Sequence, residues 1–160
     1  MKLKINNISL ILFLLLNVSK ISAQTNQDFY PQYLPIENKF CPNKINCIYL
    51  EVARSLQEQK KGLMFRPGLK DDHGMLFILD NQRKISIWMR NTLIPLDLIF
   101  ISDSKIVNLY KNVPPCPFSE CKKYKSIASV DRIIELNAGT IDKHNISLGQ
   151  VIKIEEINKL

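Results

Sequence analysis

The sequence has few of the residues that nucleophilic catalysis requires. Its two histidines are His73, between Asp72 and Gly74 in a polar stretch, and His144, at the end of an expected helical turn. A Ser or Cys nucleophile needs a histidine base that an acid orients, and no G-x-S-x-G turn occurs in the chain. We therefore interpret both histidines as surface residues and expect a protein without enzymatic activity of this kind.

A continuous basic face is also missing, although the formal net charge is +7. Lys and Arg alternate with acids along the chain, apart from the short pairs Lys60–Lys61 and Lys122–Lys123. Binding of nucleic acid needs a basic face with aromatic or groove-reading side chains. We expect no nucleic-acid partner, and only a weak attraction to an acidic envelope polymer.

Long apolar runs are absent except at the N-terminus. Lys2 and Lys4 precede the apolar run Ile8–Val18, and the small residues Ser22–Ala23 follow it. This order is typical of a secretory signal peptide. The run is shorter than the roughly 20 residues that a membrane span needs. We expect cleavage after Ala23, an exported protein of the periplasm or cell surface, and no integral membrane segment after cleavage.

Four cysteines are present, and all of them follow the expected cleavage point. Two local disulfides are favoured, Cys41–Cys47 and Cys116–Cys121, because an even number of cysteines in an exported chain indicates disulfides. The sequence leaves the other two connectivities open. A four-thiolate zinc site is disfavoured, because such sites usually separate paired cysteines by two residues. We expect no cofactor.

The remaining chain predicts a flexible lead over residues 24–40 and one domain over residues 41–160. A capping box at Ser55–Glu58 predicts a short helix that ends near Gly62, and a helical turn is expected near Thr140–His144. Alternating apolar residues predict short strands at 48–54, 74–79, 83–89, 96–102, 106–111, 132–137 and 151–157. A half-buried strand is expected at 48–54, hairpins at 74–89 and 96–111, and a loop at Pro114–Lys123. Many short strands indicate an all-β sandwich or barrel.

Several motifs carry a family resemblance, from about Leu50 to Ile154. The motifs are GLMFR, GMLF, WMRNTLIPLD and IELNAG. They resemble the family called domain of unknown function 192, which includes small exported bacterial proteins, and the segment Pro114–Tyr124 is similar to its cyanobacterial members. The resemblance implies a jelly-roll-like antiparallel β sandwich with one or two short helices. It implies no activity.

Polar residues interrupt the strand pattern around Arg90–Pro95 and predict a loop at one end of the domain. Such a loop beside an aromatic ring is suited to a polar, carbohydrate- or peptide-like ligand. The candidate binding residues are Arg66, Trp88, Arg90, Asn91, Thr92, Asp97 and Glu135. A structural interpretation is slightly favoured, in which Trp88 fills the core and Asn91, Thr92 and Asp97 bond to backbone groups of the turn.

Two other functions remain open. Asp97 and Glu135 both interrupt apolar runs, and as a carboxylate pair they would suit a hydrolase or lyase that acts on an envelope polymer. A buried carboxylate held by Arg66 or by backbone donors is the favoured alternative. Met64, Met75 and Met89, with His73 and Trp88 nearby in the sequence, would suit Cu(I). Packing in the core is the favoured role of these methionines.

Overall fold

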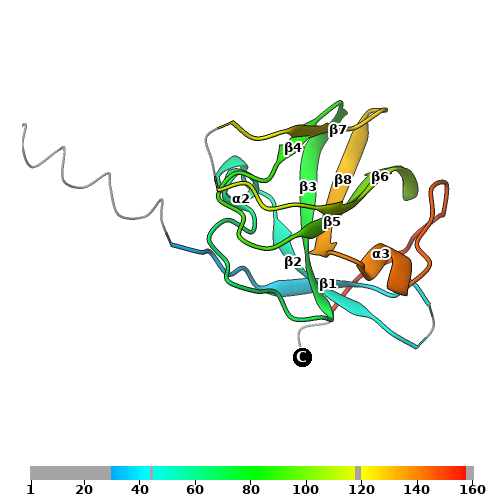
Figure 1. Ribbon diagram of the computed structural model, residues 1–160. Coiled ribbons are helices and arrows are strands. Elements are labelled where there is room, and N and C mark those ends of the chain that lie inside the picture. Colours follow the sequence, from blue (N-terminus) through cyan, green and yellow to red (C-terminus); the bar gives the residue numbers. More distant parts are fainter. Residues whose placement is uncertain (1–29, 44, 118–119, 158–160) are drawn as a thin grey trace, which may run out of the picture. The chain divides into compact units, whose positions relative to one another are not determined.

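The computed structural model describes residues 30–43, 45–117 and 120–157, and Pro31–Leu160 form one compact unit. The elements in chain order are β1 (Ile36–Phe40), β2 (Ile48–Ala53), α2 (Leu56–Lys61), β3 (His73–Arg83), β4 (Ser86–Trp88), β5 (Leu96–Ser102), β6 (Lys105–Val113), β7 (Lys123–Lys125), β8 (Val130–Asn137), α3 (Thr140–Lys143) and β9 (Ile154–Glu156) (Figure 1). None of the helices within these ranges is long and apolar enough to cross a membrane. The expected signal peptide, Met1–Ala23, lies outside the described residues.

Seven strands form one sheet, in the order β6-β5-β8-β3-β2-β1-β9, and β4 and β7 form a separate two-stranded ribbon. All neighbouring strands are antiparallel except β2 and β3, which are parallel. Parallel neighbours need a crossover connection, and α2 lies in that connection. The expected all-β class with two short helices is confirmed. The second layer has only two strands, and the main sheet is mixed rather than purely antiparallel.

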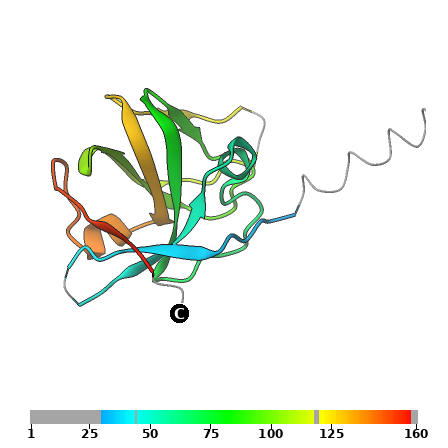
Figure 2. The same ribbon diagram turned by 180° about the vertical axis from the view of Figure 1, so that it is seen from behind.

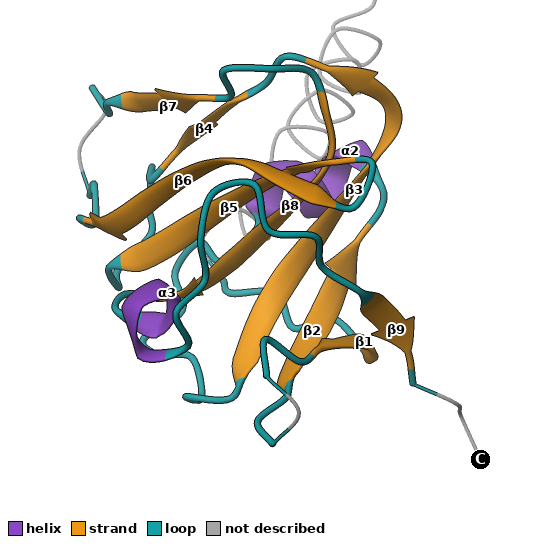
Figure 3. Ribbon diagram, turned by 90° about the vertical axis from the view of Figure 1, so that its right-hand side faces the viewer, coloured by secondary structure: helices purple, strands orange, loops and turns teal. Residues whose placement is uncertain are grey.

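The C-terminal segment joins the two edges of the seven-stranded sheet. Ile106 N donates to Gln150 O at 2.9 Å, and Ile152 N donates to Ser104 O at 2.8 Å, beside the start of β6. Two residues later the same segment becomes β9 and pairs with β1 at the other edge (Figures 2 and 3). The sheet is therefore curled on itself, with an inner face and an outer face.

Both faces of the curled sheet are buried. Side chains that alternate along each strand point to opposite faces, so Leu76 belongs to one apolar cluster while Met75 and Phe77 belong to another. We call the cluster that contains Leu76 the inner core, and it also includes Ile146 and Ile152 from the C-terminal part of the chain. We call the cluster that contains Met75 and Phe77 the outer core, and it packs beneath β4 and β7 through Ile87 and Tyr124.

Local sequence signals agree with the structure. The helix after Ser55 has the predicted capping box, with Ser55 Oγ accepting from Glu58 N and Glu58 Oε2 accepting from Ser55 N. β5 and β6 form the predicted hairpin, and its turn residues Asp103 and Ser104 both have positive φ. The disulfides are Cys41–Cys47 and Cys116–Cys121, the favoured pairing.

Non-local features of the fold differ from the predictions. The expected flexible lead contains strand β1, because Ile36–Phe40 pairs with both β2 and β9. The predicted hairpin over residues 74–89 is wrong, because β3 continues through Arg83 and β4 pairs with β7 instead. Pro114–Lys123 was expected to be a loop, and its last residue begins β7. β2 is buried on both faces rather than half-buried.

Candidate binding pocket

A cavity of about 350 Å³ lies between α2 and β4, over the outer face of the sheet. Its inner wall consists of the buried residues Leu63, Phe77, Leu79, Thr92, Ile133 and Glu135. Its mouth is formed by the exposed residues Leu56, Lys60, Arg83, Ser86 and Trp88. The cavity is therefore apolar along most of its wall and carries two polar side chains at depth.

Glu135 is the only acid that lines this cavity within the described part of the chain. It lies on β8, 6% exposed, and its carboxyl oxygens form no hydrogen bond with a described residue but are accessible from the cavity. Burial raises the pKa of Glu135 to about 8, and the nearby positive charge of Arg66 opposes this shift only in part. A carboxyl group with this pKa is mostly protonated at neutral pH and can donate a hydrogen bond.

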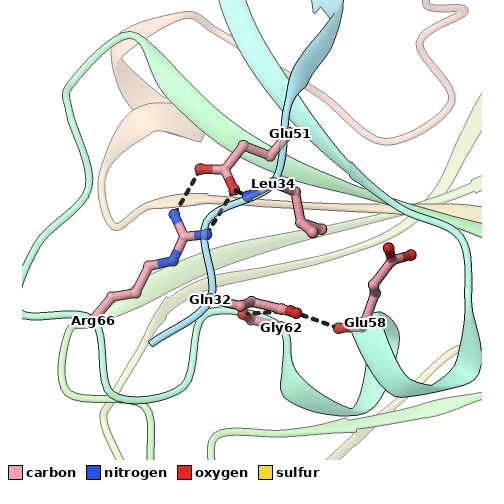
Figure 4. A network of polar contacts seen from close by, with 6 residues as sticks. All are labelled: Gln32, Leu34, Glu51, Glu58, Gly62 and Arg66. Carbon is pink, nitrogen blue, oxygen red and sulfur yellow. Dashed lines mark hydrogen bonds and ion pairs between the residues drawn. The ribbon is translucent and has the colours of Figure 1, made fainter. Parts of the chain in front are cut away.

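Arg66 does not neutralise Glu135 because it is already paired with Glu51. The fork of Arg66 donates to both oxygens of Glu51, from Nη1 to Oε1 at 2.7 Å and from Nη2 to Oε2 at 2.6 Å (Figure 4). Leu34 N donates to Glu51 Oε2 at 2.6 Å, and the ring of Tyr33 lies 4.5 Å from the guanidinium carbon. Arg66 and Glu51 are 1% and 7% exposed in their side chains. This bidentate buried pair balances its own charges.

The register of the sheet explains why these three charged groups are close. Glu51 on β2 lies opposite Met75 on β3, and Met75 lies opposite Glu135 on β8. Residues opposite one another in a sheet point to the same face. Glu51 and Glu135 therefore flank Met75 on the outer face, and Arg66 reaches this row from the segment that follows α2.

Side-chain amides fix α2, which forms one side of the pocket and contains no buried residue. Gln59 Nε2 donates to Ile78 O of β3 at 2.7 Å. At the C-terminal end of the helix, Gln32 Nε2 donates to Glu58 O at 2.8 Å and to Gly62 O at 3.2 Å (Figure 4). The helix is thus anchored to the sheet and to the N-terminal segment by polar contacts.

The favoured interpretation of Trp88 as a core residue is wrong. Trp88 is 39% exposed on β4 and lines the mouth of the pocket, with the guanidinium carbon of Arg90 5.6 Å from its ring centroid. The predicted loop that follows is present. Asn91, with φ 56°, donates from N to Cys116 O at 3.0 Å and accepts at O from Phe65 N at 2.8 Å. Thr92 is buried on the pocket wall, and its hydroxyl forms no hydrogen bond with the described residues.

Asp97 lies away from this pocket. It is fully buried on β5, opposite Leu136, whereas Glu135 lies opposite Leu98. The two carboxyl groups therefore point to opposite faces of the sheet. Asp97 Oδ1 accepts from Asn112 N and Oδ2 accepts from Ile141 N, each at 2.8 Å. Its role is structural, since it holds β6 and the start of α3.

The three methionines have different surroundings. Met75 and Met89 are completely buried in the outer core, whereas Met64 is half-buried on the wall of the pocket. His73 bonds to Asp72 at 2.7 Å. Across the ranges that the structure describes, no three His, Cys, Asp or Glu residues form a group that could hold a metal ion. The positions of Met75 and Met89 support the core-packing interpretation.

Trp88, Thr92 and Glu135 thus come together at the pocket, with Arg66 beside Glu135 and Arg90 beside Trp88. Sequence reasoning missed Glu51 and the contribution of α2. Glu51 alternates with Leu50 and Val52 and was assigned to an exposed face of a half-buried strand. A charged residue in this position is compatible with a strand that is exposed on one face and with a strand that is covered on both faces. Only the fold shows that Glu51 is buried.

Comparisons with known proteins agree with the motifs. A protein described as a "putative transcription regulator" from Sinorhizobium meliloti 1021 is similar in structure, with 30% identity, a TM-score of 0.68, and coverage of 79% of this chain and 98% of that one. A protein of unknown function from Novosphingobium aromaticivorans DSM 12444 is also 30% identical, with a TM-score of 0.65 and coverage of 79% and 92%. No curated protein matches the chain. The family model DUF192, described as "Uncharacterized ACR", matches residues 39–154. The chain therefore belongs to the DUF192 family.

Proposed function

We propose that this domain binds a small molecule with an apolar body in the pocket between α2 and β4. The observation that carries the proposal is Glu135, a buried carboxyl group that faces the cavity without a hydrogen-bond partner among the described residues. The residue is almost wholly buried, but its carboxyl oxygens are not among the fully buried polar atoms without a partner, so they are accessible from the cavity. A ligand with an acceptor at its inner end fits this arrangement, because protonated Glu135 and the Thr92 hydroxyl can both donate to that acceptor.

The dimensions and chemistry of the cavity support this class of ligand. Its volume of about 350 Å³ lies at the small end of the range for ligand pockets, roughly 300–1,000 Å³. Leu63, Phe77, Leu79 and Ile133 form an apolar wall around two polar groups, which is the usual composition of such pockets. A carbohydrate would leave many hydroxyl groups against this wall, so an amphipathic molecule fits better than the polar ligand expected from the sequence.

The alternative of a hydrolase or lyase has less support. It depends on Asp97 and Glu135 acting as a pair, and the two side chains lie on opposite faces of the sheet. Glu51, the other acid in the row of Glu135, is occupied by Arg66 and Leu34 N. Among the described residues that line the cavity, none supplies Glu135 with a second carboxylate for acid–base chemistry.

We also propose that the protein is exported. Two disulfides are typical of proteins in oxidising compartments, and the order of charge, apolar run and small residues in Met1–Ala23 is typical of a signal peptide. A pocket of this kind in the periplasm or at the cell surface would meet small molecules of the envelope or its surroundings.

The binding proposal can be tested with N-phenyl-1-naphthylamine, a neutral apolar fluorophore. Trp88 is the only tryptophan of the chain and lines the pocket mouth. We expect one molecule of the probe to bind per protein and to quench Trp88 by energy transfer. Absence of this quenching in the folded protein would contradict the proposal.

Variants that fill the pocket locate the binding site. Leu63→Phe and Ile87→Phe each add volume at the wall, and we expect the probe to bind about tenfold more weakly to either, a loss of about 1.4 kcal/mol. Leu148→Phe adds the same group as Leu63→Phe at a residue that is 64% exposed and does not line the pocket, and it should bind normally. Thermal unfolding verifies that each variant is folded. Equal affinity in all variants would place the probe elsewhere.

A further inference from the structure

The pocket has opposite electrostatic character at its two ends. At the inner end Glu135 is mostly neutral at pH 7, and Thr92 is the other buried polar residue among the described residues that line the cavity. At the mouth Lys60 and Arg83 are exposed, and neither forms an ion pair with a described residue. Lys61 also lines the cavity, with Nζ 4.9 Å from the ring centroid of Phe65.

The ribbon beside the mouth adds two further cations. Lys123 on β7 lies opposite Trp88 on β4, and Lys125 lies opposite Ser86. Because opposite residues point to the same face, both lysines lie on the same face of the ribbon as the two mouth residues Trp88 and Ser86. Arg90, two residues after β4, adds a further cation, with its guanidinium carbon 5.6 Å from the ring centroid of Trp88.

Within the described part of the chain, no acid forms an ion pair with Lys60 or Arg83. Among the described lining residues the sole carboxyl group is that of Glu135. Glu58 on α2 is the acid nearest in sequence to Lys60, and its carboxylate accepts from Arg54 N at 2.9 Å and from Ser55 N at 2.8 Å at the start of the helix. The mouth therefore carries exposed cations, whereas the buried part of the wall is mostly apolar and includes Glu135.

We propose that the natural ligand is an anionic amphiphile, with its apolar body against Leu63, Phe77 and Ile133 and its acidic head between Lys60 and Arg83. This inference rests on the proposed function and specifies its ligand class, a carboxylate or other acid carried on one apolar chain or ring. A head at the mouth remains partly hydrated, so the charge of the ligand does not have to be buried. The apolar body supplies most of the affinity, and the cations select the sign of the charge.

Three probes with one apolar body test the charge preference. Octanoate, octanol and octylammonium are titrated into the protein near neutral pH and low salt, with Trp88 fluorescence and calorimetry as readouts. We expect octanoate to bind about tenfold more tightly than octanol, and octylammonium to bind most weakly. Added salt should weaken the binding of octanoate and leave that of octanol unchanged, because salt screens only the charged head.

Charge variants assign the preference to the mouth. In Lys60→Gln/Arg83→Gln the ratio of octanol to octanoate dissociation constants should fall severalfold, since the two exposed cations on either side of the acidic head are gone. Lys105→Gln/Lys143→Gln removes the same charge at exposed residues that do not line the pocket and should keep the ratio. Both pairs are on the surface, so neither is expected to prevent folding.

The outcomes separate the two proposals. If none of the three probes binds, the proposed binding function fails. If octanol or octylammonium binds as tightly as octanoate, the pocket binds small molecules and the anionic ligand class is wrong. If octanoate is preferred but Lys60→Gln/Arg83→Gln keeps the preference, the acidic head is not held at the mouth and the inference is overturned.

Discussion

Arg66 lies near two carboxyl groups and pairs with only one of them. Glu51 takes both ends of the guanidinium fork and also the N–H of Leu34, so Glu135 has no remaining counter-charge. A buried carboxylate without a partner is costly, and protonation avoids that cost. The pairing of Glu51 with Arg66 therefore makes Glu135 a neutral donor at the inner end of the pocket.

This account predicts how stability depends on pH at Glu135. The pKa of Glu135 is raised from 4.5 to about 8. Between these values the folded protein keeps a proton that the unfolded chain has released, so stability falls as pH rises through this window. The total loss is on the order of 5 kcal/mol, at roughly 1.4 kcal/mol for each pH unit. Glu135→Gln cannot ionise and should lack this loss.

Urea denaturation at a series of pH values from about 5 to 8 measures the difference between the two proteins. Burial lowers the pKa of His144, so this residue also contributes to the pH dependence of stability. His144 is present in both proteins, so its contribution cancels when they are compared. Parallel pH profiles for the wild type and Glu135→Gln would show that Glu135 is not protonated in the folded state.

A second prediction concerns Asp97, whose carboxylate accepts N–H groups from β6 and from α3. Asparagine has one acceptor oxygen, so Asp97→Asn leaves one buried N–H facing an NH₂ group. We expect a loss of about 2–3 kcal/mol in the free energy of unfolding. Asp142→Asn is the control, because Asp142 is an exposed acid on α3 whose pair with Lys111 contributes less than about 1 kcal/mol. Equal losses would contradict the structural role of Asp97.

At the scale of elements, β4 forms one wall of the pocket, and its partner β7 follows the loop that the Cys116–Cys121 disulfide closes. Cys116 O accepts from Asn91 N, and Cys121 lies two residues before β7. The disulfide between these cysteines therefore fixes the distance between the loop after β4 and the start of β7. Its removal should affect the pocket as well as stability.

We predict that Cys116→Ser/Cys121→Ser costs about 2 kcal/mol, the chain-entropy value for so short a loop, and also changes the emission of Trp88 in the folded state. Cys41→Ser/Cys47→Ser opens a loop of nearly the same length before β2. It should cost a similar amount, about 2 kcal/mol, and leave Trp88 emission unchanged. Both variants are compared by urea denaturation and fluorescence. If Trp88 emission changed equally in the two variants, or in neither, the Cys116–Cys121 disulfide would not be what positions the ribbon.

Elements that depend on neighbouring residues could be predicted from the sequence. The capping box at Ser55 and the Asp103–Ser104 turn specify their conformations within a few residues, and both are present. The pairing of β4 with β7 and of β1 with β9 depends on segments far apart in the chain. No local pattern determines such pairings, and a three-residue strand such as Lys123–Lys125 is too short to show alternation.

The same distinction applies to the site. Trp88, Thr92 and Glu135 could be identified because polar or aromatic residues interrupt apolar segments of the sequence. Glu51 could not, because its nearness to Glu135 follows from the register of β2, β3 and β8. Gly74 in that register approaches Glu135 O so closely that a Cβ there would lie 2.9 Å from it. The pairing of β2, β3 and β8 therefore determines that Glu51 and Glu135 lie near each other.

At the scale of the whole molecule, the C-terminal segment closes the sheet, because Gly149–Ile152 bonds to β6 and β9 bonds to β1. The inner core is sealed by Ile146 and Ile152 of this region. The pocket lies outside this closed sheet, under α2 and the ribbon. The closed sheet thus forms the base of the pocket, while α2 is held by polar contacts and the ribbon by Ile87, Tyr124 and a disulfide loop.

The last prediction concerns the route by which this molecule acquires its disulfides. When the full chain is produced in a bacterial host, we expect the exported protein to begin near Gln24 and to contain no thiol that reacts with an alkylating reagent before reduction. Leu14→Arg places a charge in the apolar run and should block export, which leaves the full-length chain in a reducing compartment with alkylatable cysteines. Mass spectrometry with and without a reductant measures the N-terminus and the four cysteines in one experiment. An exported wild-type chain that retains Met1, or one whose thiols react without reduction, would contradict the proposal of export with disulfide formation.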